Sequence, residues 1–166
     1  TLSSSSAASD VYKRQTLLQL IEEDIGPAEQ LLQLLRDEYV ALHGRDMPAL
    51  EDILAYKQSL VVLLDQHGRR RSELLASLGL TPDRAGIEVL ASQSHLGPQL
   101  LQQLDVLGNL LNECRAVNER NGESIVLQQA TTANQIRILM GGEAPSLYDS
   151  RGSTSPLSKP RALSQA

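Results

Sequence analysis

Residues 16–43 read TLLQLIEEDIGPAEQLLQLLRDEYVALH, and the spacing of their apolar side chains decides the fold class. Apolar residues recur every seven positions in two series offset by three: Leu18, Ile25, Leu32 and Tyr39 in one, and Ile21, Ala28, Leu35 and Leu42 in the other. Alternating steps of three and four place both series on one stripe of an α-helix. The segment therefore predicts a long amphipathic helix that buries one face.

Gly26-Pro27 interrupts this stretch. A proline inside a helix removes a backbone hydrogen bond and costs roughly 3 kcal/mol or more. The apolar phase nevertheless continues on both sides of the proline. We therefore predict one kinked helix over residues 16–43, with two separate helices as the alternative.

A second helix is expected over residues 47–78. Asp46 is a suitable N-cap, and Pro48 is tolerated in the first helical turn. The apolar seam of this helix has two series, which are Leu50, Leu64 and Leu78 in one and Leu54, Val61 and Leu75 in the other. Three further residues fall on the same stripe and make it imperfect: Lys57, Gly68 and Arg71.

A short helix over residues 82–93 and a long one that ends at Gly141-Gly142 complete the pattern. The long segment carries one stripe with steps of four and three: Leu100, Leu104, Leu107, Leu111, Cys114, Asn118, Asn121 and Ile125. A further run places Val126, Ala133 and Met140 at a spacing of seven. The chain has no Phe and no Trp, and a leucine-rich core suits helices rather than sheets. The predicted fold is all-α, an antiparallel, left-handed bundle of three long helices and one short helix.

The two ends of the chain do not follow this pattern. Residues 3–15 read SSSSAASDVYKRQ, which looks like translated adapter sequence, so we expect residues 1–15 to be a non-native leader outside the fold. Residues 143–166 are serine-rich and hold three of the seven prolines. They cannot bury enough surface to offset the loss of backbone entropy, so a flexible, disordered tail is expected. The predicted bundle domain is residues 16–142.

Composition argues against several classes of partner. The net charge of −5 gives no support to nucleic acid, because the neutralisation of phosphates needs a basic surface. No apolar run approaches the roughly 20 residues that span a bilayer, so membrane insertion is not expected. Cys114 is the single cysteine and cannot form an internal disulfide, which favours a reducing, cytoplasmic location. Its place on the stripe predicts a small buried side chain.

The sequence shows no constellation for catalysis, a metal or a cofactor. The three histidines lie far apart, and there is no phosphate-binding glycine loop, GxSxG or CxxC. Residues 22–24 are consecutive carboxylates that would point apart on a helix, and we interpret them as a solvated face. The arginines at 69–71 are either a surface stretch with a buried stem or a site for an acidic partner. We expect a binding protein without a cofactor rather than an enzyme.

Two segments are not explained by core packing alone. Asn118 and Asn121 share the apolar stripe and are followed by Gly122. Because a buried Asn must be hydrogen-bonded, they form either a structural polar layer or part of an uncovered stripe that receives a partner. Leu147 and Tyr148 lie in the tail, where the tyrosine is either incidental or the anchor of a short binding motif.

The order of these features resembles the FlgN family over residues 16–152. The features are a helix that starts at Asp46 and carries Lys57, N-x-x-N-G at residues 118–122, and S-L-Y-x-x-x-G at residues 146–152. The resemblance implies a cytoplasmic chaperone of the flagellar type III export system. Such chaperones bind hook-associated proteins of the hook–filament junction, and the expected contact is the C-terminal amphipathic helix of the client.

The resemblance also implies roles for individual residues. Leu147 and Tyr148 would dock to the cytosolic domain of the export gate. Asn118, Asn121 and Gly122 would belong to the client-binding helix. The alternative function is a structural coiled-coil or adaptor protein without a chaperone role, which would use the same stripes only for assembly.

Overall fold

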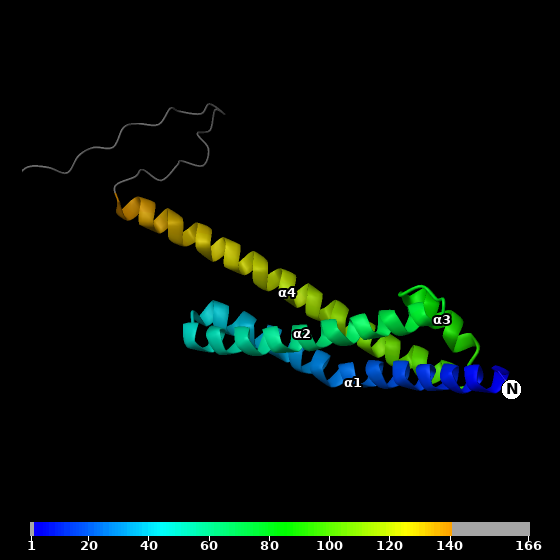
Figure 1. Ribbon diagram of the computed structural model, residues 1–166. Helices are drawn as coiled ribbons and strands as arrows, with labels where there is room; N and C mark the ends of the chain where they lie inside the picture. The colour runs from blue at the N-terminus through cyan, green and yellow to red at the C-terminus, as the bar shows by residue number, and fades with distance from the viewer. Residues whose placement is uncertain (1, 141–166) are drawn as a thin grey trace, which may run out of the picture. The chain divides into compact units, whose positions relative to one another are not determined.

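The computed structural model describes the backbone of residues 2–140 and the side chains of residues 9–140. The order of elements is α1 (Leu2–Gly44), α2 (Met47–Ser77), α3 (Arg84–Ser92) and α4 (Gly97–Leu139) (Figure 1). All regular structure in this part of the chain is helical, so the prediction of three long helices and one short helix is confirmed. The tail motif Leu147-Tyr148 lies outside the described residues.

The chain divides into two compact units, and the boundary between them lies inside α4. The first extends to Asn121 and contains α1, α2, α3 and the first half of α4. The second begins at Gly122 and contains the rest of α4. Each unit is considered by itself below.

α1 is a single helix with Pro27 in its interior, so the alternative of two separate helices is wrong. It begins at Leu2 and therefore runs through residues 2–15, without a break at the boundary expected at residue 16. Lys13 Nζ donates to the carbonyl of Ser77 at 3.4 Å, and Arg14 Nη1 donates to that of Gln93 at 3.1 Å. An existing helix can be extended without a new nucleus, which explains this continuity. The assignment of residues 1–15 as a non-native leader stays a prediction.

Short capped loops join the helices. Asp46 caps α2 by accepting from the amide of Ala49 at 3.1 Å, as its position in the sequence predicts. α2 stops where Gly79 adopts a φ of 71°, and the amide of Leu80 then reaches back to the carbonyl of Leu75. This left-handed cap reverses the chain. Asp83 caps α3 by accepting from the amide of Gly86. A hydrogen bond from the Thr81 hydroxyl, together with the one from Gly86, lowers the pKa of Asp83.

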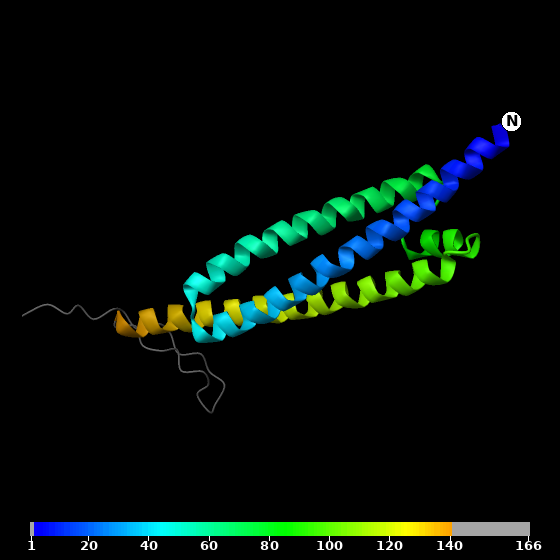
Figure 2. The same ribbon diagram turned by 90° about the horizontal axis from the view of Figure 1, so that it is seen from below.

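The core of the first unit has two clusters of buried side chains. The α3 cluster joins all four helices and consists of Leu17, Leu18, Ile21, Ala28, Leu75, Ile87, Leu90, Ala91, Leu100 and Leu107. The Cys114 cluster joins α1 and α4, with α2 packed against it, and consists of Leu31, Leu32, Leu35, Cys114 and Val117. α2 runs back beside α1 in both views (Figure 2). These clusters confirm the apolar stripe predicted for α1.

The predicted seam of α2 is wrong at two positions. Leu54 is 57 % exposed and Val61 is 49 % exposed, although both belong to the series expected in the core. The predicted seam residues Leu75 and Leu64 are buried and half-buried, and Ile53, which was not predicted, is buried with them. No described helix of the first unit covers the flank that carries Leu54 and Val61. Tyr39 at the end of α1 is likewise exposed rather than buried.

Candidate functional site

A buried polar layer lies where α1, α2 and α4 meet. Asn121 is 1 % exposed, and its Nδ2 donates to the carbonyl of Leu35 and to Glu38 Oε2, both at 2.8 Å. Lys57 Nζ donates to both carboxylate oxygens of Glu38, at 2.9 and 3.0 Å. The same amine donates to Asn118 Oδ1 at 3.2 Å. Two asparagines, one carboxylate and one amine thus tie three helices together.

This geometry supports the structural interpretation of the two asparagines. Asn121 directs its amide into α1, because both of its acceptors belong to that helix. Asn118 is exposed and touches the layer through Lys57. Gly122 is exposed, and a Cβ added there would meet nothing within 4 Å. A role of Asn118, Asn121 and Gly122 in client binding stays a prediction.

A second charged cluster joins α1 to α2, and it corrects one sequence-based interpretation. Asp24 is fully buried, whereas the carboxylates at 22–24 were expected to be solvated. Its carboxylate pairs with Arg71, and its Oδ1 lies 2.6 Å from His67 Nδ1. Arg71 is thus the one member of the arginine stretch whose head group is held inside, while Arg69 pairs with Asp65 at the surface.

The spacing of residues in the sequence already indicates that Asp24 pairs with cations of α2. Asp24 lies three residues after Ile21 and four before Ala28, which places it on the buried stripe of α1. Arg71 falls on the seam of α2, four residues after His67, so both can reach the same carboxylate. A buried carboxylate has to be paired, which makes a cation on the facing stripe the expected partner.

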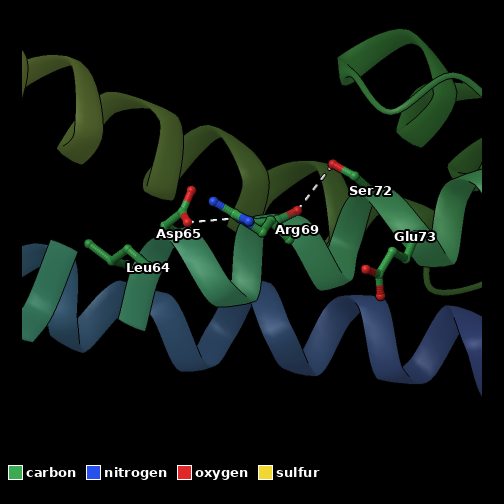
Figure 3. Close-up of a pocket in the computed structure, with 6 residues that line it drawn as sticks. Leu64, Asp65, Arg69, Ser72 and Glu73 are labelled. Carbon is green, nitrogen blue, oxygen red and sulfur yellow. Dashed lines mark hydrogen bonds and ion pairs between the residues drawn. The ribbon is translucent and has the colours of Figure 1, made fainter. Parts of the chain in front are cut away.

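An open pocket lies on α2 (Figure 3). Six α2 residues line it: Leu64, Asp65, Gly68, Arg69, Ser72 and Glu73. Arg69 Nε donates to Asp65 Oδ2 at 2.9 Å, and the Ser72 hydroxyl donates to the carbonyl of Gly68 at 3.1 Å. Gly68 has no side chain and Ser72 has a short one, so the surface of α2 is recessed at these two positions.

The Cys114 side chain is buried between α1 and α4, as expected of a small core residue. Its Sγ lies 3.6 Å from the carbonyl oxygen of Ala28. Burial raises the pKa of this thiol, which keeps it protonated at neutral pH and therefore a weak nucleophile. Within the described residues, no three His, Cys, Asp or Glu side chains gather as a metal site would require.

The second half of α4, together with Met140 just after it, carries many exposed apolar side chains. The most exposed of these are Val126, Leu127, Ile136, Ile138, Leu139 and Met140. Val126, Ala133 and Met140 recur every seven residues, so they share one face of the helix. Such a face is typical of a helix that binds a partner.

Within residues 2–140, no helix has the length and hydrophobicity needed to cross a bilayer.

Comparisons with known proteins identify relatives of this chain. A family model described as FlgN protein matches residues 13–156. A crystal structure described as a candidate flagella synthesis protein FlgN from Pseudomonas aeruginosa is 43 % identical in sequence. The match covers 75 % of this chain and 95 % of that one, with a TM-score of 0.64. No curated protein gives a significant match.

Proposed function

The chain belongs to the FlgN family, and from this membership we propose that it is a cytoplasmic chaperone of the flagellar type III export system. A role in flagellum biogenesis is supported by the family match and by the related Pseudomonas aeruginosa structure. The finer proposal is that the chain binds hook-associated proteins of the hook–filament junction. It would then deliver them to the cytosolic domain of the export gate.

The observation that carries this proposal is the FlgN match over residues 13–156, which includes α1 to α4 from Lys13 on and the Leu147-Tyr148 motif. The structure supports a binding role in a second way. The second half of α4 presents Val126 and Ile136 to solvent, followed by Met140 directly after the helix, and exposed apolar rows of this kind mark interaction surfaces. We propose that this row is the client-binding surface.

The proposed client segment is an amphipathic C-terminal helix, which would pack its apolar face against this row. If about 600 Å² of apolar surface were covered, roughly 25 cal/mol/Å² would give a gross stabilisation of about 15 kcal/mol. Much of this is offset by the costs of association and of side-chain ordering. The remaining affinity would be strong enough to protect the client and weak enough to release it. Asn118, Asn121 and Gly122 would position the start of this surface.

A chaperone of this kind should prevent its client from self-associating. We expect the full chain, added in equimolar amount, to suppress the aggregation of a purified hook-associated protein, as measured by light scattering. The suppression should be lost when the client lacks its C-terminal helix, because the proposed surface would then have nothing to cover. Equal aggregation with and without the chain would refute the chaperone role and leave the adaptor alternative.

A further inference from the structure

The exposed second half of α4 carries one polar side chain in the middle of an apolar stripe. The stripe has alternating steps of four and three, and we call it the bare stripe: Gly122, Val126, Gln129, Ala133, Ile136 and Met140. At 3.6 residues per turn, all six positions lie within about 40° of one line along the helix. All six are exposed, so the stripe is open to a partner and Gln129 is its polar member.

The amide group of Gln129 has no structural task within the described part of the chain. Its side chain is exposed and forms no hydrogen bond with another residue of 9–140. Asn121 is the opposite case, since its buried amide bonds to Leu35 and Glu38 of α1. Leucine forms helices as well as glutamine does, so helix formation does not require an amide at residue 129. The amide is therefore available to a partner.

Charged side chains are nearly absent beside the bare stripe. The positions that flank it are Glu123, Ile125, Ala130, Thr132, Arg137 and Leu139. Residues 124–136 contain no Asp, Glu, Lys or Arg. Paired helices commonly select their partners through charges at flanking positions, and a polar residue inside the stripe is the other device they use. Over these residues only the second device is present, and it is Gln129.

We propose that Gln129 determines which helix the bare stripe accepts, by hydrogen bonding to a side-chain amide or hydroxyl in the apolar stripe of the client helix. This inference rests on the client-binding role proposed above and adds the chemistry that the client must carry. A helix packed over Gln129 removes the amide from water, and a buried amide without a partner is costly. A client helix with a wholly apolar stripe is therefore rejected. One with an uncharged polar residue opposite Gln129 is accepted and held in a single register.

A second copy of the bare stripe does not meet this requirement. The stripe consists of two alternating sets, Val126, Ala133 and Met140 in one and Gly122, Gln129 and Ile136 in the other. In an antiparallel pair each set faces the other, because a step of three on one helix has to face a step of three taken backwards on its partner. Gln129 would then always face the first set, which carries no amide or hydroxyl. A parallel pair in register places Gln129 on Gln129, but it also places Ala133 on Ala133 and leaves that layer poorly filled.

The test is a double-mutant cycle between residue 129 and the client, measured by calorimetric titration of the full chain with the C-terminal helix of a hook-associated protein. In the client helix, each uncharged polar residue of its apolar stripe is replaced by leucine, one at a time. One such replacement should weaken binding to the unaltered chain by about tenfold or more, because Gln129 loses its partner. Gln129→Leu should weaken binding of the unaltered client helix for the same reason. Combined, the two changes should restore the affinity of the unaltered pair or exceed it.

Gln135→Leu is the matched control. Gln135 is also exposed, but it points about 120° away from Gln129 and lies off the bare stripe. This change should leave every affinity in the cycle unaltered, and circular dichroism checks that both variants keep their helical content.

The outcomes separate this inference from the chaperone role. Saturable binding in which no client position couples to residue 129, or in which Gln129→Leu and Gln135→Leu behave alike, overturns the selection by Gln129 and leaves the chaperone role standing. No binding of the client helix to the unaltered chain contradicts the chaperone role, and the selection fails with it. Sedimentation equilibrium gives a further check, since a dimer of the free chain that Val126→Asp dissociates would assign the bare stripe to a second copy and overturn the inference.

Discussion

At the scale of single residues, the charged side chains on the apolar stripes are paired across helices. Asp24 on α1 pairs with Arg71 on α2, and Glu38 on α1 pairs with Lys57 on α2. From the sequence alone, Lys57 and Arg71 are imperfections in the apolar seam of α2, and Asp24 is part of a solvated face. Burial of an unpaired charge is costly, so the pairs also specify which stripes face each other.

Removal of Lys57 should destabilise the bundle more than removal of the whole pair. Lys57→Met leaves the Glu38 carboxylate, which is 7 % exposed, without its cation, and we expect a loss of about 3 kcal/mol. Glu38→Gln in the same chain removes the uncompensated charge and should recover part of this loss. Urea unfolding of the two single variants and the double variant measures the coupling. Additive effects would contradict the pairing.

Tyr148 is a further single residue with a proposed role, although it lies outside the described residues. The family resemblance implies a role in docking to the export gate, and we propose this role for Tyr148. Tyr148→Ala should therefore weaken binding to the cytosolic domain of the gate, while helical content and client binding stay unchanged. A pull-down titration against the purified gate domain measures this. Unchanged gate affinity would remove the assigned role.

At the scale of elements, α3 depends on a glycine that permits close contact with the preceding loop. A Cβ on Gly86 would lie 2.0 Å from the carbonyl oxygen of Thr81, which is far inside contact distance. Asp83 fixes the same turn by accepting from the Gly86 amide. α3 is only nine residues long, and it contributes Ile87, Leu90 and Ala91 to the core.

Gly86→Ala should therefore lower the free energy of unfolding by about 1–3 kcal/mol, because the backbone of the loop has to shift. Gly108→Ala on α4 is the matched control, since a Cβ there would meet nothing within 4 Å. That change should stabilise the chain by about 0.5–1 kcal/mol, as alanine is the better helix former. Thermal unfolding followed by circular dichroism compares them. Equal effects of the two substitutions would argue against the close contact.

The helices themselves were predictable from the sequence, and their order is confirmed. Their approximate limits are also confirmed, except that α1 begins at Leu2 rather than at residue 16. Heptad spacing reveals which face of α1 is apolar, and Asp46 and Gly79 mark the ends of α2 through their capping chemistry. Spacing alone does not reveal how many helices cover a stripe. For this reason Leu54 and Val61 were assigned to the core, although no described helix of the first unit lies over them.

The candidate sites were less predictable than the fold. A sequence pattern places Asn121 on the buried face but does not show which groups it bonds. The structure supplies these partners, the carbonyl of Leu35 and the carboxylate of Glu38. The roles of Leu147 and Tyr148 came only from the family resemblance, since two residues in a serine-rich tail have no periodicity to interpret.

At the scale of the whole molecule, the chain combines a packed unit with surfaces that its own core does not use. The first unit buries two apolar clusters and two charged networks. The second half of α4 exposes apolar side chains along its length. Exposed apolar surfaces of this kind are suited to the binding of other chains, which agrees with the proposed chaperone role.

The most direct test of this role is calorimetric titration of the full chain with the C-terminal helix of a hook-associated protein. The account predicts saturable binding that Val126→Asp weakens by about tenfold or more, because it places a charge on the proposed surface. Val89→Asp, an exposed valine on α3, should leave the affinity unchanged. An absence of binding, or the same loss in both variants, would contradict the account.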